Sequence, residues 1–448
     1  MTSRTVEHPS DLAGGSGGRR RDVASRSEGL DAFARPDLGQ ALLALATSVV
    51  PFVGLWGLMY LALPVSYLLV LALAVPASGF LLRTYILFHD CAHGSLFQGR
   101  RTNAWLGGVL ALLVFTPFAR WRRDHLGHHA TAADLSRRGT GDVPTLTADE
   151  YQSRSWRGRL GYRLVRNPVV MFGLGPVYSM LLAPRWASRS AGRRIQRSVW
   201  GSNLALVLMI GGLCWLVGWR DFLLVQVPFV PLAGGTGVWL FYVQHQFDGT
   251  YWQRPGEWTY ADAALRGSSY LGLPKVLQFF TGNIGFHHVH HLNPRIPNHN
   301  LPRAHEEIAI FHDVPRLSLR DGLRAVRLKV WDEDAGRLVT WAELRGPQRE
   351  PVRAFLRRHP VVTRAATVAL VGAVALFVLG LLMTATADDM DLRVNLGLLF
   401  AAGGALVGCI GGALGPALRL IPARASWAGV GRSPVVQDDG RADPRASR

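Results

Sequence analysis

Long apolar runs recur along this chain, and several of them come in pairs joined by short turns. Four of the runs are long enough to cross a bilayer as helices, because about 20 apolar residues span the roughly 30 Å of hydrocarbon. These four runs cover residues 39–62, 65–88, 202–219 and 222–244, and two further runs of the same kind cover residues 361–383 and 394–415. The pattern predicts an integral membrane protein made of helices.

The turns between these runs predict three helical hairpins. The first pair of runs turns around Pro64, the second around Arg220, and the third around the acidic segment 388–391. Two shorter runs, at residues 104–118 and 168–183, are flanked by arginines and are too short to cross the bilayer comfortably. We expect these two runs to be helices that lie in the membrane interface.

The pattern divides the chain into four regions. Residues 1–37 and 423–448 are rich in Gly, Ser, Arg and Asp and poor in apolar residues, so we expect both ends to be disordered. Residues 38–345 form the predicted main domain, an all-α integral membrane unit with a four-span core in two hairpins, interfacial helices and a histidine-rich cap. Residues 346–422 form the predicted C-terminal two-span hairpin.

The charge of the chain predicts its orientation in the membrane. Lys and Arg number 49 against 31 Asp and Glu, and basic clusters flank the predicted spans at residues 19–21, 120–123 and 193–197. Basic loops stay on the cytosolic side, so we expect the cap and both termini to be cytosolic. The charge also fits contact with anionic lipid headgroups or a docking face for an acidic redox partner. No nucleic-acid-binding motif accompanies it, so nucleic acid is not an expected partner.

Nine histidines crowd into three short clusters. They are His89 and His93; His125, His128 and His129; and His287, His288, His290 and His291. Histidines three or four residues apart lie on one face of a helix, close enough to share a metal ion. The chain has three cysteines and no C-x-x-C arrangement, which gives no support for a thiolate site. The clusters therefore predict metal binding by imidazole.

The number of imidazoles predicts two metal ions. His288 points away from its neighbours on a helix, and we interpret it as a structural or supporting residue. His245 lies at the cytosolic end of its predicted span and is either a metal ligand or an ordinary residue at the end of a helix. Together with His245, the well-placed imidazoles are more numerous than one metal ion can bind. Imidazole binds zinc, copper, iron and nickel, and activation of O2 would require iron or, less readily, copper. The other histidines, which we expect to be structural or surface residues, are His8, His299, His305, His312 and His359.

Three strings of the sequence carry a resemblance to a known family. They are HDCAHGS at residues 89–95, HLGHH at residues 125–129 and GNIGFHHVHH at residues 282–291. In order, spacing and location they resemble the three histidine boxes of the membrane fatty acid desaturase family, and the similarity covers roughly residues 38–330. The string YVQHQF at residues 242–247 resembles an additional ligand site of the bacterial acyl-lipid members.

The resemblance implies a four-span helical bundle with a cytosolic cap and a non-haem centre of two iron ions, with O2 as co-substrate. The iron ligands that it implies are His89, His93, His125, His128, His129, His245, His287, His290 and His291. It also implies membrane lipid acyl chains as the substrate and an external electron donor, a ferredoxin with its reductase. The implied location is the bacterial cytoplasmic membrane, with the active site on the cytosolic side.

Further residues are expected to orient the ligands or to line an apolar channel for the acyl chain. The candidates for orienting ligands are Asp90, Asp124, Asn283 and His288, with helix capping or solvation as the alternative. The candidates for lining the channel are Trp105, Phe115, Trp239, Phe241 and Tyr242, with ordinary lipid-facing packing as the alternative.

The expected reaction removes two hydrogens from adjacent methylenes of a lipid acyl chain and leaves a cis double bond. Methylene hydrogens are not acidic, and histidine clusters without a paired catalytic carboxylate agree with redox chemistry rather than acid–base chemistry. Two alternatives stay open: a di-iron hydroxylase or other oxygenase acting on lipid or hydrocarbon, and a membrane metal transporter. Transport sites lie near the bilayer midplane, whereas these histidines cluster at the ends of the predicted spans.

Overall fold

The computed structural model describes residues 28–139, 141–187 and 191–345. In this part of the chain the protein is mostly helical, and four helices are long and apolar enough to cross a membrane. They are α2 (Leu38–Ala62), α3 (Tyr67–His93), α8 (Arg193–Val217) and α9 (Trp219–His245). The four predicted spans of the main domain are therefore present as long apolar helices. The C-terminal hairpin predicted at residues 346–422 and the tail at residues 423–448 lie outside the described residues.

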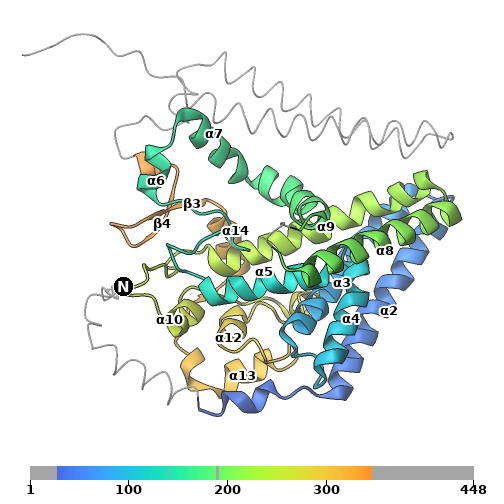
Figure 1. The fold of residues 1–448 in the computed structure, drawn as a ribbon, viewed down its shortest axis with the longest axis horizontal. Helices are drawn as coiled ribbons and strands as arrows, with labels where there is room; N and C mark the ends of the chain where they lie inside the picture. The colour runs from blue at the N-terminus through green and yellow to red at the C-terminus, as the bar shows by residue number, and fades with distance from the viewer. Residues whose placement is uncertain (1–27, 140, 188–190, 346–448) are drawn as a thin grey trace, which may run out of the picture.

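Helix α3 is at the centre of the membrane part. It packs along α2, α9 and the shorter α4 (Arg100–Leu113), and α8 lies beside α9 (Figure 1). Phe52, Phe88 and Phe229 are buried in the apolar core between these helices. Other apolar side chains of the same helices point outward and are exposed, such as Leu61 and Val207. Helices that are apolar on all sides are typical of membrane spans.

Local sequence determines where these helices begin and end. The side chains of Asp37 and Ser66 accept hydrogen bonds from backbone N–H groups in the first turns of α2 and α3. Gly218 alone separates α8 from α9, and its φ of 84° is a left-handed conformation that glycine adopts readily. The turn predicted around Arg220 therefore lies two residues earlier, and Arg220 belongs to the first turn of α9.

A sharp corner joins α4 to α5 (Phe118–Thr131), whose axes differ by 104°. The helix predicted at residues 104–118 ends at Leu113, because the chain turns there. The ring of Phe118 occupies the space where a Cβ atom on Gly107 would lie, so glycine at this position lets α5 begin directly against α4. The corner directs α5 back toward the end of α3, which α5 contacts.

The second interfacial run, predicted at residues 168–183, forms two wide helical turns. They are the π-helical segments η3 (Val170–Leu174) and η4 (Val177–Leu182), followed by the 3-10 turn η5 (Ala183–Arg185). Two short helices, α6 (Ala148–Ser153) and α7 (Trp156–Val165), precede this run. Gly235 of α9 permits the close approach of η3, because a Cβ atom there would lie 2.6 Å from the carbonyl oxygen of Phe172.

The cap differs from the all-α prediction because it contains two small sheets. Strands β1 (Tyr270–Leu271) and β2 (Arg316–Leu317) pair in parallel, and β3 (Leu328–Asp332) and β4 (Arg337–Thr340) form an antiparallel hairpin. The hairpin turn includes Gly336, whose φ is 60°. The cap helices are α10 (Tyr260–Leu265), α11 (Lys275–Phe280), α12 (His287–Leu292), α13 (Leu301–Glu307) and α14 (Leu319–Ala325), with short turns η6 (Ala309–Phe311) and η7 (Glu343–Arg345).

Residues just before the predicted domain boundary at residue 37 contact the cap. The short turn η2 (Leu30–Ala34) buries Leu30 and Phe33 in an apolar cluster of the cap that includes Leu301 and Ile308. Asn300 donates a side-chain hydrogen bond of 2.9 Å to the backbone oxygen of Phe33. Two apolar side chains of this otherwise polar region therefore complete a cap cluster.

A fully buried arginine ties the cap to α9. The guanidinium of Arg166 donates to the carbonyl oxygens of Pro144 and Leu328 and to the side-chain oxygen of Gln246, at 3.2, 3.1 and 2.9 Å. Lys329 in turn donates to the carbonyl oxygen of Arg166 at 2.8 Å, and burial lowers the pKa of Lys329 to about 7. Arg166 thus joins three chain segments that are far apart in the sequence.

We expect Gly285→Ala to destabilise the cap. Leu271 donates a backbone hydrogen bond of 2.8 Å to Gly285, and a Cβ atom at residue 285 would lie 2.6 Å from the carbonyl oxygen of Leu271. Relief of this overlap must move β1 and should cost about 1–3 kcal/mol. The unfolding temperature of the detergent-solubilised protein measures the effect. Gly256→Ala is the matched control, since its Cβ atom would meet nothing within 4 Å; equal unfolding temperatures for the two variants would contradict the contact.

Candidate metal centre

The ends of four helices bring the predicted ligands together. His89 and His93 lie in the last turns of α3, and His245 is the last residue of α9. The second histidine cluster lies in the second half of α5, and the third lies in α12 of the cap. Two membrane helices and two shorter helices therefore supply the imidazoles, which meet where the spans join the cap.

The structure gathers the nine predicted ligands into two groups. Within each group every residue offers one nitrogen, and these nitrogens all lie within 4.8 Å of one another. The five-histidine group consists of His89, His93, His125, His129 and His290, and the four-histidine group consists of His128, His245, His287 and His291. Both groups have the donor set and the spacing to hold a metal ion.

The second and third histidine clusters are each divided between the two groups, whereas His89 and His93 of the first cluster both belong to the five-histidine group. His125 and His129 stay together, whereas His128 belongs to the other group. Helical geometry explains the division, because neighbouring residues of an α-helix point about 100° apart while residues four apart point in nearly the same direction. The sequence spacing predicted that the histidines of one cluster share a metal ion, whereas the histidines of α5 and of α12 are divided between two groups.

The nitrogens of the four-histidine group face one another in a way that hydrogen bonds do not explain. Nε2 of His245 lies 3.1 Å from Nε2 of His128 and 3.0 Å from Nε2 of His287. Nδ1 of His128 contacts the carboxylate of Asp142 at 2.5 Å, and Nδ1 of His245 contacts the carbonyl oxygen of Gly267 at 3.2 Å. Each oxygen accepts a hydrogen bond, so the Nδ1 atom that faces it must carry a proton. In a neutral imidazole, Nε2 then carries no proton and has a free lone pair.

Two such lone pairs in a buried space repel each other unless a cation lies between them. The measured spacing also suits a metal, because two nitrogens bound at right angles with bonds of about 2.1 Å lie about 3.0 Å apart. The residues present therefore fit a bound metal ion, on the basis of the tautomers that Asp142 and Gly267 impose on His128 and His245.

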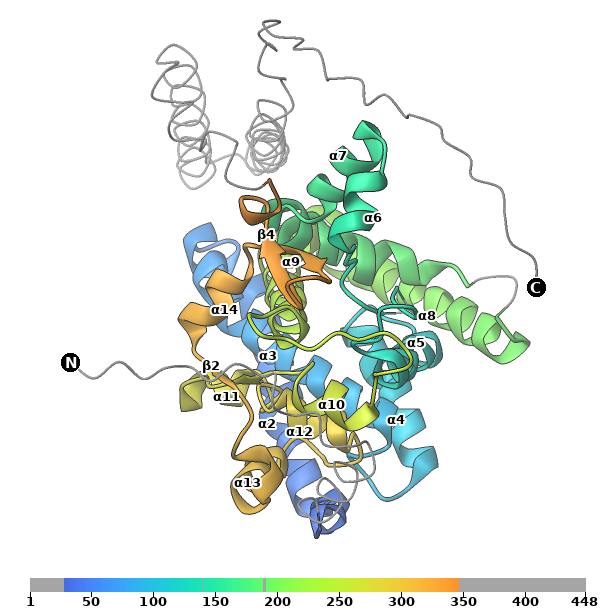
Figure 2. The same cartoon turned by 90° about the vertical axis from the view of Figure 1, so that its left-hand side faces the viewer.

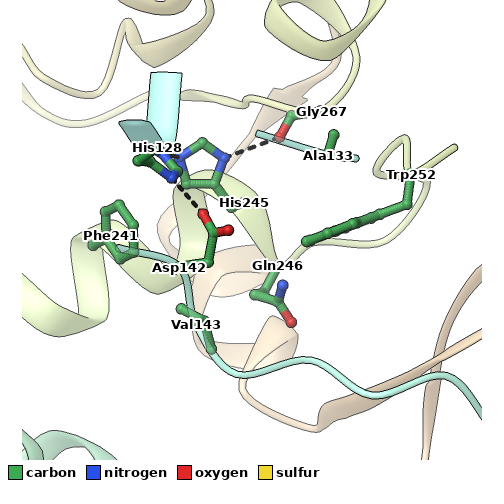
Figure 3. Close-up of a pocket in the computed structure, with 9 residues that line it drawn as sticks. All are labelled: His128, Ala133, Asp142, Val143, Phe241, His245, Gln246, Trp252 and Gly267. Carbon is green, nitrogen blue, oxygen red and sulfur yellow. Dashed lines mark hydrogen bonds and ion pairs between the residues drawn. The ribbon is translucent and has the colours of Figure 1, made fainter. Parts of the chain in front are cut away.

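Asp142 and Gly267 are functional residues that the sequence alone did not reveal. Figure 3 shows the Asp142 carboxylate directed at His128 and the Gly267 oxygen directed at His245, around a small cavity also lined by Phe241. Hydrogen bonds of this kind orient an imidazole and increase the donor strength of its other nitrogen. Asp142 lies in a loop well beyond the second cluster, so no local spacing connects it to His128.

The five-histidine group shows the same convergence of ring nitrogens. Nε2 of His129 lies 3.2 Å from Nε2 of His125 and 3.0 Å from Nε2 of His290. The ring of Trp121 stacks on His125 with centroids 4.4 Å apart and an angle of 18° between the planes. Nε2 of His93 is buried and has no hydrogen-bond partner among the described residues. A metal ion would give these nitrogens a common partner.

Asp90 is the predicted supporting residue that contacts a ligand. One carboxylate oxygen of Asp90 lies 3.2 Å from Nδ1 of His89, and the other accepts two hydrogen bonds from Asn298, at 2.9 Å from the backbone and 2.7 Å from the side chain. Asn283, whose φ is 59°, donates from its side chain to the carbonyl oxygen of Asn298 at 3.1 Å. Asn283 therefore acts on His89 through two intermediate residues.

The two other predicted supporting residues have different surroundings. Asp124 forms ion pairs with Arg120 and Arg123, at 3.6 and 2.8 Å, which agrees with the alternative interpretation of a solvated carboxylate. His288 is fully buried and belongs to neither metal group. Its Nε2 lies 3.0 Å from Nδ1 of His305, so these two histidines form a pair inside the cap.

The histidines of α12 are in the form that binds metal. Burial, followed by the effect of neighbouring imidazoles, holds the pKa values of His287, His290 and His291 well below the usual range for histidine. These side chains are therefore neutral at pH 7, and metal binding requires neutral imidazole.

The predicted channel residues occupy different environments. Trp105 is 70% exposed on α4, and Phe115 lies at the corner between α4 and α5. The hydroxyl of Tyr242 donates a hydrogen bond of 2.7 Å to a backbone oxygen of β3, so this residue joins α9 to the cap. Phe241, by contrast, lies against the four-histidine group, with its ring centroid 5.1 Å from that of His128.

Trp239, the fifth predicted channel residue, lines an open groove of about 340 Å³ on α9. The other residues that line this groove are Phe172, Pro231, Leu232, Gly235 and Thr236. Trp239 lies six residues before His245, which corresponds to about 9 Å along the helix. One end of this apolar groove is thus less than two helical turns of α9 from His245.

These features define a mostly helical membrane protein with two histidine groups suited to metal at the ends of its spans. The family model described as fatty acid desaturase matches residues 64–319, a range that contains all nine predicted ligands. The chain therefore belongs to the fatty acid desaturase family and is an oxidoreductase of that kind, as its histidine strings predicted.

Similar proteins carry the same description. "Fatty acid desaturase" of Bacillus subtilis (strain 168) is 44% identical over 333 residues, which cover 73% of this chain and 95% of that protein. "Omega-6 fatty acid desaturase, chloroplastic" of Arabidopsis thaliana is 27% identical over 268 residues, 56% of each chain. "sn-1 acyl-lipid omega-3 desaturase (ferredoxin)" of Synechocystis sp. (strain ATCC 27184 / PCC 6803 / Kazusa) is 25% identical over 244 residues, 50% of this chain and 63% of that protein.

We expect His128→Ala to lose metal from the four-histidine group and to retain it in the five-histidine group, because His128 belongs to one group alone. Elemental analysis of the purified variant measures the metal content per chain. His312→Ala is the matched control, since His312 is an exposed cap histidine outside both groups. Equal metal content in the two variants would exclude His128 as a ligand.

Proposed function

We propose that this protein introduces a cis double bond into the acyl chains of membrane lipids, using two iron ions and O2. The observation that carries the proposal is the convergence of two all-imidazole groups at the end of a span whose lipid-facing side carries an apolar groove. Nine ligands divided into five and four leave room for a small exogenous molecule at each ion.

Iron suits this donor set and this reaction. Imidazole binds several transition metals, but zinc has no redox chemistry and desaturation is an oxidation. When bound, the two ions would supply the electron transfer with O2 that cleavage of an unactivated C–H bond requires. The ligands would be the five-histidine and four-histidine groups defined above.

The protein's own residues hold the ligands in one orientation. Asp142 fixes the tautomer of His128, and the carbonyl oxygen of Gly267 fixes that of His245. Asp90 plays the same part for His89 in the other group. These contacts direct nitrogen lone pairs inward before a metal arrives, so less reorganisation is needed on binding.

Substrate access follows from the position of the groove. An acyl chain lying along α9 between Pro231 and Trp239 would remain in an apolar environment over about 12 Å of helix. Near the end of α9, the ring of Phe241 contacts both His128 and His245, with centroid distances of 5.1 and 5.3 Å. Phe241 is thus placed to exclude water from the metal centre.

The electron donor is proposed to be a separate ferredoxin with its reductase. One relative carries ferredoxin in its name, and the net charge of +18 favours an acidic soluble partner. Basic segments beside the spans support a cytosolic metal centre in a bacterial cytoplasmic membrane.

Expression in a host that lacks the product tests the reaction. We expect new cis-unsaturated acyl chains in the membrane lipids, measured by gas chromatography with mass spectrometry, and their loss in the His128→Ala variant. Hydroxylated chains without new double bonds would instead identify a hydroxylase. Metal uptake into proteoliposomes with no change in acyl chains would identify a transporter.

We expect Thr236→Trp to shift products toward shorter acyl chains or to reduce their yield, because the new indole would fill part of the groove. The chain-length profile of the unsaturated products measures this effect. Val207→Trp places the same side chain on the exposed face of α8, outside the groove, and serves as the control. Identical product profiles for both variants would show that the groove does not hold the acyl chain.

A further inference from the structure

Two short helices of the cap expose a cluster of large apolar side chains. Val276 is 67% exposed on α11, and Leu323 is 61% exposed on α14. The other exposed apolar members of the cluster are Leu277, Phe279 and Leu319. Clustered apolar side chains on a surface, unlike single ones, mark a site of interaction.

The parallel pair of strands places the two helices on the same side of the molecule. Gly272 donates a backbone hydrogen bond of 2.8 Å to Leu317, which continues the pairing of β1 with β2. Helix α11 begins shortly after β1, and α14 begins shortly after β2, so both leave the same end of this small sheet. Figure 2 shows α11, β2 and α14 along one side of the molecule. The two helices with their exposed apolar residues therefore lie on the same side of the molecule.

This surface lies alongside the spans rather than beyond their ends. The ring of Phe280 fills the space over Gly79 and contacts the ring of Phe80, with centroids 5.1 Å apart. Gly79 precedes the ligand His89 by ten residues, which is about 15 Å along α3 toward the membrane interior. Gly322 of α14 lies in the same way against Trp239 of α9.

Basic residues border the apolar surface. Arg320, Arg324 and Arg327 are exposed on or just after α14, and Lys275 is exposed at the start of α11. Asp321, at the start of α14, forms the capping box with Ser318. A short helix with an apolar stripe beside a basic one is typical of segments that lie in an anionic membrane interface, where Lys and Arg reach the phosphates.

We propose that α11 and α14 insert their exposed apolar faces into the cytosolic leaflet, with their basic residues at the level of the lipid phosphates. The bilayer is the partner because both helices pack against membrane spans. Helix α11 contacts α3 at Gly79 and Phe80, and α14 contacts α9 at Trp239, so both helices lie at the level of the spans. The cap is then partly embedded. Helix α14 also borders the groove through Trp239, so lipids of this leaflet lie next to the groove.

Collision measurements on spin-labelled protein test this proposal. In the full chain, Cys214 and Cys409 are replaced by Ala, the buried Cys91 is kept, and one cysteine is introduced by Leu323→Cys or, separately, by Val276→Cys. Each variant is labelled with a nitroxide and reconstituted in vesicles of phosphatidylethanolamine and phosphatidylglycerol. Electron paramagnetic resonance then compares collisions of the label with O2, which concentrates in lipid, and with a water-soluble nickel chelate.

Two control positions define the expected values. Val207→Cys reports the lipid-facing side of α8, and Asp334→Cys reports the exposed turn between β3 and β4. We expect the ratio of O2 to nickel collisions at Leu323 and Val276 to approach that at Val207 and to exceed that at Asp334.

Two results would overturn the proposal. Strong nickel collisions at both test positions would show that this surface faces water. Weak collisions with both reagents would show that another part of the chain or a second copy covers it. Agreement between Leu323 and Val276 guards against a local disturbance at either residue, and the measurement does not depend on desaturase activity.

Discussion

The arrangement of this protein depends on a repulsion that its fold creates. Asp142 and Gly267 leave the inner nitrogens of His128 and His245 without protons, and the fold then holds these nitrogens 3.1 Å apart in a buried space. A metal ion turns this unfavourable contact into a favourable one. Because neutral imidazole binds metal and charged imidazole does not, the burial that keeps His287 and His291 of the same group neutral serves the same end. Metal binding therefore stabilises the packing of the helices that carry these histidines.

The apolar spans and the histidines that converge in the structure could be predicted from the sequence because both rest on local patterns. Apolar length alone marks a membrane helix, and spacing of three or four residues places histidines on one side of a helix. The division of the nine histidines into two groups could not be predicted, since it depends on how α5 and α12 are rotated relative to α3 and α9. Asp142 was missed for a similar reason: its contact with His128 is made by tertiary structure across a loop.

The cap was the least predictable part of the fold. Its strands are two to five residues long and carry no clear alternation, so the polar composition of the region indicated only a cytosolic segment. The channel candidates show the same limit. Phe241 and Tyr242 are neighbours in sequence, yet Phe241 faces the histidines while the hydroxyl of Tyr242 bonds to β3. The direction of each side chain on the helix decides which group it contacts, and this direction could not be predicted from the residue types alone.

Arg166 has a consequence for the order in which the molecule assembles. Its guanidinium is buried among oxygens of Pro144, Gln246 and Leu328, and the last of these is synthesised more than 160 positions after the arginine itself. Until that oxygen is available, a positive charge would be enclosed with an incomplete set of partners, which disfavours early closure. Nascent chains would thus keep the imidazoles of α5 and α9 accessible until most of the cap has been synthesised, so that a metal ion can reach them before the cap packs against α9.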